Sequence, residues 1–298
     1  GVLFQTGELL HGVVGGFQSD RLTLSSDLFG ALSAAAGDVR AVLLGTTTIA
    51  ELSTLDAEFQ GARLRNGDLV RGTIAWINAD VVGIDVGGKI RQLPRVRVAA
   101  VQWPTAARAK PAPRFTVCLR NGDRIAGPLQ VGNRAIAIES TIAGKHALNP
   151  NALLALWRDD DAVTQLAEAT PLKTVFTAQF DELSSTPLRG TEGHIGARRY
   201  PCALACRAGS SVDFALTGAQ STFSSDFGLA AHATNAAIFR VQLDDAVAFD
   251  SGIVNPGEAP RQTTIKLGAA KRLRLSVSTP PNGLAFGAHG VWGWPVVR

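Results

Sequence analysis

One stretch of the sequence has the spacing of a phosphate-binding loop. Gly83 and Gly88 stand five residues apart, and Lys89 follows the second glycine. Such a loop also places a hydroxyl for Mg²⁺ directly after the lysine, and it lies between a strand and the N-terminus of a helix. The next residue is Ile90, and an extended pattern continues beyond it. We therefore interpret the segment as a β-hairpin and the match as coincidental.

Residue types that bind metals or act as nucleophiles are present but scattered. No histidine has a short spacing to another histidine or to a cysteine that would suit a metal ion. The histidines are His11, His146, His194, His232 and His289. No G-x-S-x-G elbow or recognisable Ser/His/Asp set occurs, and no carboxylate pair stands out. The runs Asp159–Asp161 and Asp244–Asp245 are typical of loops and turns. The sequence predicts no catalytic residue, no metal and no cofactor.

Length and composition indicate a globular chain of several domains. With 298 residues, the chain is too long for one ordinary hydrophobic core, and its 46% hydrophobic residues are enough to form packed interiors. No apolar run is long enough to cross a membrane as a helix. Cys202 and Cys206 would lie roughly 13 Å apart on a strand, beyond disulfide reach, and Cys118 fits a core strand. Because the chain has no Met, we expect Gly1 to follow a processed or trimmed segment, of the kind that can hold a signal peptide or an anchor.

Basic residues are concentrated in one part of the chain. Ten lie between Phe59 and Arg114, opposed by Asp68, Asp80 and Asp85. They are Arg63, Arg65, Arg71, Lys89, Arg91, Arg95, Arg97, Arg108, Lys110 and Arg114. A positive segment attracts anions of many kinds, including nucleic acid. We favour a solvated strand face followed by a basic linker. Binding of single strands needs exposed aromatic platforms, and the first half offers only Phe17, Trp76 and Trp103.

A turn motif occurs three times in the first half. Each copy has a strand, a glycine followed by an acidic residue, and a second glycine five residues after the first. The glycine pairs are Gly7 with Gly12, Gly67 with Gly72, and Gly122 with Gly127. Asn66-Gly67 and Asn121-Gly122 are hairpin signals of the kind that needs a positive φ at both turn positions. The later glycine of each pair suits a bulge or a sharp bend of a strand.

The spacing of the copies predicts three small β-barrels in tandem. The first glycines are 60 and 55 residues apart, which is the length of a small domain. We place the barrels, which resemble SH3-like or Sm-like folds, at residues 1–45, 59–104 and 115–158. A Pro-rich linker runs from Pro104 to Arg114, and a short helix or long loop covers Thr46 to Glu58.

The last third of the chain has the pattern of an antiparallel β-sandwich or jelly roll. From about Pro171 onward, short segments of alternating hydrophobicity are separated by Gly, Pro, Asn and Asp. Seven or eight such strands over some 110 residues are typical of that architecture. The whole chain is therefore predicted to be all-β.

This third resembles the NPCBM family of carbohydrate-binding-type modules. The similar segments are Ser211–Gly218, Ser221–Gly228, Ala237–Leu243, Val247–Gly252, Gly268–Leu275 and Ala288–Trp292. The resemblance covers about residues 171–298 and implies a galactose-binding-like β-sandwich. Such modules are often attached to glycoside hydrolases or to secreted bacterial proteins.

The chain departs from the family pattern where the family carries polar residues. Arg207 stands at a histidine position, and Leu229 to Ala231 replace an acidic pair. Near the end, Ala288 and Val291 occupy positions that are acidic in the family. The resemblance therefore implies that carboxylates for sugar hydroxyls or for a hard cation are absent. The remaining candidate ligand-binding residues are Trp294, Trp292, His289 and Arg207, although both tryptophans also suit core or rim packing.

The sequence and its resemblance together predict a non-catalytic binding protein of bacterial, exported type, either secreted or associated with the cell envelope. The expected partner is a glycan, bound weakly and preferably acidic, or another envelope protein. Two alternatives stay open: an assembly scaffold whose sandwich has lost its ligand, and nucleic-acid binding through the basic barrels, which we consider the weakest.

Overall fold

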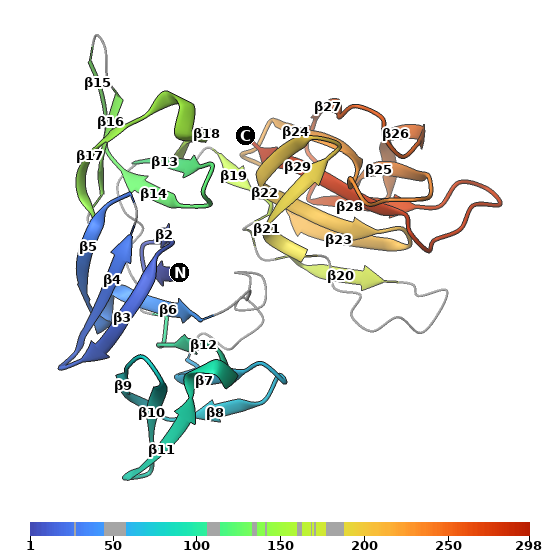
Figure 1. Ribbon diagram of the computed structural model, residues 1–298. Coiled ribbons are helices and arrows are strands. Elements are labelled where there is room, and N and C mark those ends of the chain that lie inside the picture. Colours follow the sequence, from blue (N-terminus) through green and yellow to red (C-terminus); the bar gives the residue numbers. More distant parts are fainter. Residues whose placement is uncertain are drawn as a thin grey trace. The chain divides into compact units, whose positions relative to one another are not determined.

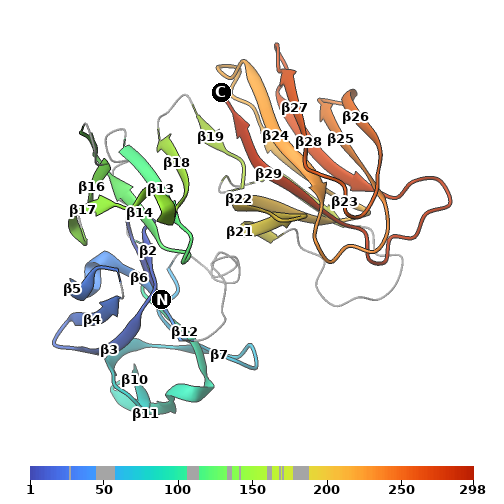
Figure 2. The same cartoon turned by 45° about the horizontal axis from the view of Figure 1, so that its top comes forward.

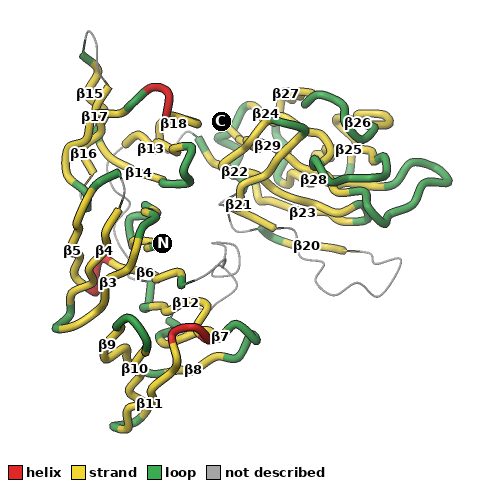
Figure 3. The backbone as a smooth tube through the Cα atoms, in the orientation of Figure 1, coloured by secondary structure: helices red, strands yellow, loops and turns green. Residues whose placement is uncertain are grey.

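The computed structural model shows an all-β chain that divides into two compact units, Gly1–Asp159 and Asp160–Arg298 (Figure 1). The structure describes residues 1–26, 28–44, 58–105, 114–132, 136–140, 142–159, 163–167, 169, 171–176 and 188–298. Most of the predicted linkers, at 46–58 and 104–114, lie outside these residues. Apart from three 3₁₀ turns, the described residues of regular structure are strands (Figure 3). The predicted all-β class is confirmed.

The first unit contains three copies of the same element order, which is five strands, a 3₁₀ turn and a sixth strand. The first copy has β1 (Val2–Phe4), β2 (Leu9–Leu10), β3 (Val13–Gln18), β4 (Arg21–Ser26), β5 (Gly30–Ala35), η1 (Ala36–Asp38) and β6 (Val39–Leu43). The second has β7 (Gly61–Leu64), β8 (Leu69–Arg71), β9 (Thr73–Ile77), β10 (Val81–Val86), β11 (Lys89–Pro94), η2 (Arg95–Arg97) and β12 (Val98–Gln102). The third has β13 (Arg114–Leu119), β14 (Arg124–Gly127), β15 (Leu129–Val131), β16 (Ile136–Ser140), β17 (Gly144–Leu148), η3 (Pro150–Ala152) and β18 (Leu153–Asp159).

The three copies are joined edge to edge. The first, second and last strands of all copies form one nine-stranded sheet in the order β18-β13-β14-β2-β1-β6-β12-β7-β8. The middle strands form a six-stranded sheet, β11-β10-β9-β3-β4-β5, and a three-stranded sheet, β15-β16-β17. The first copy therefore lies between the third and the second. One buried cluster includes Val2, Val98 and Val117, one from each copy. Closed barrels at 1–45, 59–104 and 115–158 stay a prediction.

Gly7, Gly67 and Gly122 occupy equivalent turns, as predicted. Each has a φ of 86 to 95° and donates its N–H to the carbonyl oxygen three residues before it. In the second copy, the Asn66 side-chain oxygen accepts the N–H of Asp68 at 3.2 Å. Asn66 does not have a positive φ, so the expectation of two positive-φ residues was wrong. Only the glycine takes the left-handed conformation, which is the geometry of a three-residue hairpin loop closed by a glycine bulge.

The second glycine of each pair marks a place where two backbones come close together. A Cβ at Gly12, Gly72 or Gly127 would lie 2.2, 2.3 or 2.0 Å from the carbonyl oxygen of Ser25, Asp85 or Glu139, respectively. These carbonyls belong to the fourth strand of the same copy. Because glycine has no Cβ, the two backbones can lie this close together where the chain bends.

Residues 83–89 form a β-hairpin, as predicted. β10 and β11 pair antiparallel with Val86 opposite Lys89. Gly87 and Gly88 form the turn with φ values of 63° and 83°. The lysine therefore follows a hairpin turn and begins a strand, which is not the geometry of a phosphate-binding loop.

The second unit is a β-sandwich (Figure 2). Its strands are β19 (Thr164–Gln165), β20 (Lys173–Phe176), β21 (Leu188–Ile195), β22 (Arg198–Arg207), β23 (Ser210–Ala215), β24 (Thr222–Leu229), β25 (Ala237–Leu243), β26 (Ala246–Val254), β27 (Arg261–Lys266), β28 (Arg272–Ser278) and β29 (His289–Val297). One sheet has the order β21-β22-β29-β24-β27, with β19 also paired to β29, and the other has the order β20-β23-β28-β25-β26. Aromatic side chains from both sheets, such as Phe227 and Phe239, meet in the core with ring centroids 5.2 Å apart.

Candidate functional site

Arg207 and His289 lie side by side at one end of the sandwich. Arg207 ends β22 and is the register partner of His289, which begins β29. Both are partly exposed. The ring of His289 also contacts that of the exposed His232, with centroids 4.7 Å apart. The structure thus brings two of the four predicted site residues together and adds His232, which follows β24.

Trp292 lies in the core of the sandwich. Its side chain has no exposed surface, and its ring contacts Phe239 and Phe227 with centroid separations of 5.2 and 5.8 Å. Its Nε1 has no hydrogen-bond partner among the described residues. A direct contact with a ligand is therefore not available to Trp292, and it is removed from the candidate site.

Trp294 is partly buried on the other face of the same strand. It packs against a cluster formed by Ile195, Tyr200, Ala203, Ala230 and Val291. Its φ is 51°, a conformation that residues with bulky side chains rarely adopt. Period-two alternation would put both tryptophans on one face. The left-handed residue breaks this alternation, so that Trp292 enters the core while Trp294 does not.

A polar group lies beside this cluster. The Tyr200 hydroxyl donates to Asp226 Oδ2 at 2.8 Å, and Arg198 Nη1 lies 3.0 Å from the same oxygen. Burial, followed by the hydrogen bond to Asp226, raises the pKa of Tyr200 well above its ordinary value. The tyrosine therefore stays protonated and the carboxylate is doubly satisfied. This arrangement ties β22, which carries Tyr200 and Arg198, to Asp226 on β24.

Two loops lie at the Arg207–His289 end of the sandwich, and one of them carries the exposed aromatic side chain of Phe286. Residues 230–235 and 284–289 are tied together: Asn235 Nδ2 donates to the Phe286 carbonyl at 2.7 Å, and the Thr234 N–H donates to the Gly287 carbonyl at 2.9 Å. The side chains of Phe286 and Leu284 are 65% and 61% exposed. We name the surface formed by Arg207, His232, Asn235, Phe286 and His289 the loop-end surface.

Sequence reasoning did not find Phe286. The available signal was the apolar segment Leu284–Phe286, which directly follows the turn-forming residues Pro280 to Gly283. Residues in such a position have no strand neighbours to cover them. The positions at which family carboxylates are absent fall in different environments: Ala230, Ala288 and Val291 are buried, and Ala231 is exposed.

Two of the three aromatic side chains considered as platforms for nucleic acid are buried in the first unit. Phe17 and Trp103 are buried and contact each other with ring centroids 5.3 Å apart. The Trp76 ring lies against Gly83, where a Cβ would meet it at 2.5 Å. Of the three, Trp76 alone is partly exposed, so the single-strand binding alternative has little support from the aromatic residues on which it depended.

Within the described residues, no group of three or more His, Cys, Asp and Glu side chains is placed to hold a metal ion. The cysteines Cys118, Cys202 and Cys206 are buried and unbridged. Among the same residues, no helix has the length and apolarity needed to cross a membrane.

Several solved structures resemble the chain. A CBM51 module of a family GH95 protein from Clostridium perfringens, in complex with methyl-galactose, is 16% identical and covers 46% of this chain and 99% of its own, with a TM-score of 0.39. Tandem CBM51 modules of a family 98 glycoside hydrolase from Streptococcus pneumoniae are 11% identical over 97% of this chain and 88% of their own, with a TM-score of 0.37. The M60 catalytic domain of Clostridium perfringens ZmpB with two CBM51 domains is 11% identical over 96% of this chain and 31% of its own, with a TM-score of 0.40.

No curated protein matches the chain. The sequence of the second unit, however, matches a family from residue 166 to residue 298. The match begins five residues before the predicted boundary at 171 and extends to the last residue. The predicted resemblance is confirmed: residues 166–298 of this chain match the NPCBM/NEW2 domain.

Proposed function

We propose that the second unit binds a carbohydrate, without catalysis, in an exported or envelope-associated bacterial protein. Its NPCBM/NEW2 domain supports this proposal. The observation that carries it is the loop-end surface: the loop with the exposed Phe286 ring is tied to the loop that carries His232 and Asn235, and the same end of the sandwich holds His289 and Arg207. An aromatic ring can stack on the apolar face of a sugar, while polar groups around it fix the orientation of the hydroxyls.

The charges of this surface favour an acidic glycan. Neither loop 230–235 nor loop 284–289 contains an acidic residue, and Arg207 lies beside His289. A guanidinium holds a carboxylate or sulfate through two parallel hydrogen bonds, which a neutral sugar exploits less fully. Because no carboxylate of these loops can accept sugar hydroxyls, we expect weak binding that depends on charge.

The test is a titration of the full chain with neutral and with uronic-acid oligosaccharides at about 0.05 and 0.5 M salt, where charge screening differs strongly. We expect the uronic acids to bind more tightly, and their affinity to fall at the higher salt concentration. Phe286→Ala should weaken binding about tenfold at both salt concentrations, since it removes the stacking ring. Arg207→Gln should remove the preference for acidic sugars.

Leu172→Ala is the matched control. Leu172 is 63% exposed, similar to Phe286, but it precedes β20 at the edge of the opposite sheet, so its removal should not change binding. Tight binding of a neutral sugar that does not respond to salt would contradict the acidic preference. Absence of binding for both classes of sugar would favour the alternative of an assembly scaffold.

A further inference from the structure

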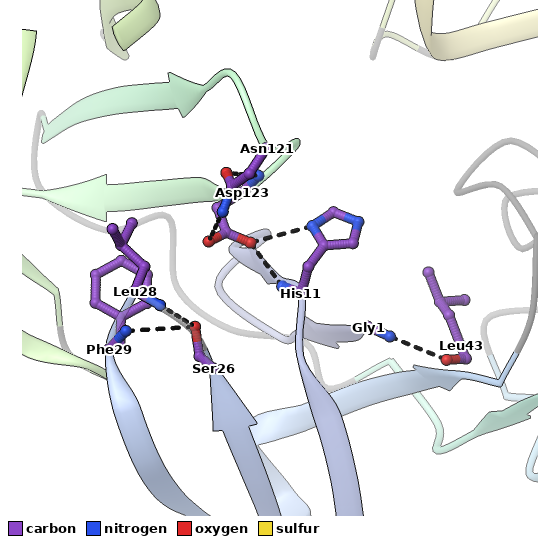
Figure 4. Close-up of polar contacts among 8 residues, drawn as sticks. All are labelled: Gly1, His11, Ser26, Leu28, Phe29, Leu43, Asn121 and Asp123. Atoms are coloured by element: carbon purple, nitrogen blue, oxygen red, sulfur yellow. Dashed lines mark hydrogen bonds and ion pairs between the residues drawn. The ribbon is translucent and has the colours of Figure 1, made fainter. Parts of the chain in front are cut away.

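The first and third copies of the first unit contact each other through a reciprocal exchange. The Glu8 carboxylate accepts hydrogen bonds from the Ala126 N–H at 3.2 Å and from Ser140 Oγ at 2.6 Å. Asp123 Oδ1 accepts the His11 N–H at 2.6 Å and lies 3.1 Å from His11 Nδ1 (Figure 4). Both carboxylates are fully buried. Each copy thus inserts the acidic residue of its turn into the other copy.

This exchange has the symmetry of a two-fold axis. Glu8 and Asp123 directly follow the turn glycines of their copies, and each accepts the N–H of the residue three positions after the other acid. The strands β2 and β14 pair antiparallel between these contacts, with Leu9 opposite Arg124. Leu9 and Arg124 are the residues that follow the two acids. The axis therefore runs through this residue pair, and the interface is isologous in type.

The second copy carries the same motif on a strand beyond which no other described strand pairs. Asp68, Leu69 and Arg71 correspond to Glu8, Leu9 and His11. β8 ends the nine-stranded sheet as the structure describes it. Asp68 and Arg71 are exposed, and the Leu69 side chain is 44% exposed. The Asn66 amide donates to Asp68 Oδ2 at 2.8 Å, as the Asn121 amide does to Asp123 Oδ2 at 2.8 Å.

The backbone of β8 is oriented to receive a strand. The Leu64 N–H donates to the Asp68 carbonyl at 2.8 Å, and the Gly72 N–H donates to the Gln60 carbonyl at 3.1 Å. Along an antiparallel strand, backbone groups point alternately toward the two neighbours. The N–H and C=O groups of Leu69 and Arg71 therefore point away from β7, like those of Leu9 and His11 on β2.

We propose that β8 pairs with β8 of a second copy of this chain, in the geometry that joins β2 to β14. Leu69 of each protomer lies opposite Leu69 of the other at the two-fold axis. Asp68 of each accepts the Arg71 N–H of the other, as Asp123 accepts that of His11, and forms an ion pair with the Arg71 guanidinium, which takes the place of the His11 ring. Charges on an edge strand ordinarily keep other strands away. Here they have opposite signs and are placed reciprocally, so they select this pairing.

Sedimentation velocity of the full chain over a concentration series tests the proposal, with wild type expected to reach twice the chain mass. Asp68→Lys places a lysine against Arg71 of the other protomer, and Arg71→Glu places a glutamate against its Asp68, so that each variant has two like-charge contacts per dimer. Each variant alone should therefore show a dimer dissociation constant at least about tenfold higher. Mixed in equal amounts, the two variants can form a heterodimer in which one contact pairs the new lysine with the new glutamate and the other keeps the original Asp68–Arg71 pair. Recovery of dimers in the mixture also demonstrates that each variant is folded.

Arg91→Glu is the matched control because Arg91 is an exposed arginine on the edge strand β11 of the other sheet, and this variant should dimerise like wild type. Wild type that stays monomeric at all concentrations would overturn the proposal. So would single variants that dimerise like wild type, or a mixture of the two that stays monomeric.

Discussion

Asp213 and Arg274 lie opposite each other on β23 and β28 and form a two-point ion pair. Arg274 Nε and Nη2 donate to the two carboxylate oxygens at 2.7 and 2.8 Å. The carboxylate is almost fully buried. The hydrogen bonds from Arg274 lower the pKa of Asp213, and burial, which acts in the opposite direction, does not cancel this effect. This pair is a bidentate contact that holds a central strand pair of the sandwich.

Asp213→Asn should lower the free energy of unfolding by about 2 kcal/mol at pH 7, because it leaves the guanidinium with a weaker acceptor. The folded-state pKa is lower than the unfolded value of about 3.9. The contribution of the pair is therefore present above about pH 4 and is lost as the pH falls through the folded-state pKa. Denaturant unfolding of wild type and variant at pH 7 and at about pH 3 measures this, and the difference should shrink at the lower pH.

Asp250→Asn is the control, since the Asp250–Arg240 pair is much more exposed and should contribute less. An equal loss of stability for both variants would contradict the role given to burial. A loss for Asp213→Asn that is the same at both pH values would contradict the assignment of the pKa.

At the scale of elements, the equivalent bends in the first unit depend on close backbone contact. Gly127→Ala should destabilise the first unit by at least about 2 kcal/mol, because its Cβ would lie 2.0 Å from the Glu139 carbonyl oxygen and backbone must move. Gly37→Ala is the matched control, since a Cβ there meets nothing within 4 Å. Thermal unfolding of both variants measures the difference. Equal melting temperatures for the two variants would show that the backbone at Gly127 can move away from Glu139 without a loss of stability.

The sequence predicts the strands, the turns and the equivalence of the copies because these depend on local features. Alternating hydrophobicity and the glycine at each turn act within a few residues. The edge-to-edge joining of the copies was not predicted, because the hydrogen-bond partners of Glu8 in the third copy lie 118 and 132 residues away. The separation of Trp292 from Trp294 was not predicted either, since it results from one left-handed residue inside a strand. Phe286 was missed because exposure of a loop side chain depends on its neighbours in space.

At the scale of the whole molecule, the division into two compact units predicts two unfolding events. Differential scanning calorimetry of the full chain should resolve two transitions. Gly127→Ala should lower the temperature of one and Asp213→Asn that of the other, because the two residues lie in different units. A single transition that both substitutions shift would contradict independent units.

The central position of the first copy in the nine-stranded sheet has a consequence during synthesis. The ribosome releases this copy first, but both of its neighbours in the sheet are made later. At about 5 to 20 residues per second, the backbone donor for Glu8 follows it by 118 residues, or roughly 6 to 24 seconds. Until then the nascent chain exposes the edge of β2 and keeps the Glu8 carboxylate in water. Of the three copies, the first is therefore translated before the others, but it cannot form all of its contacts until the third copy has been made.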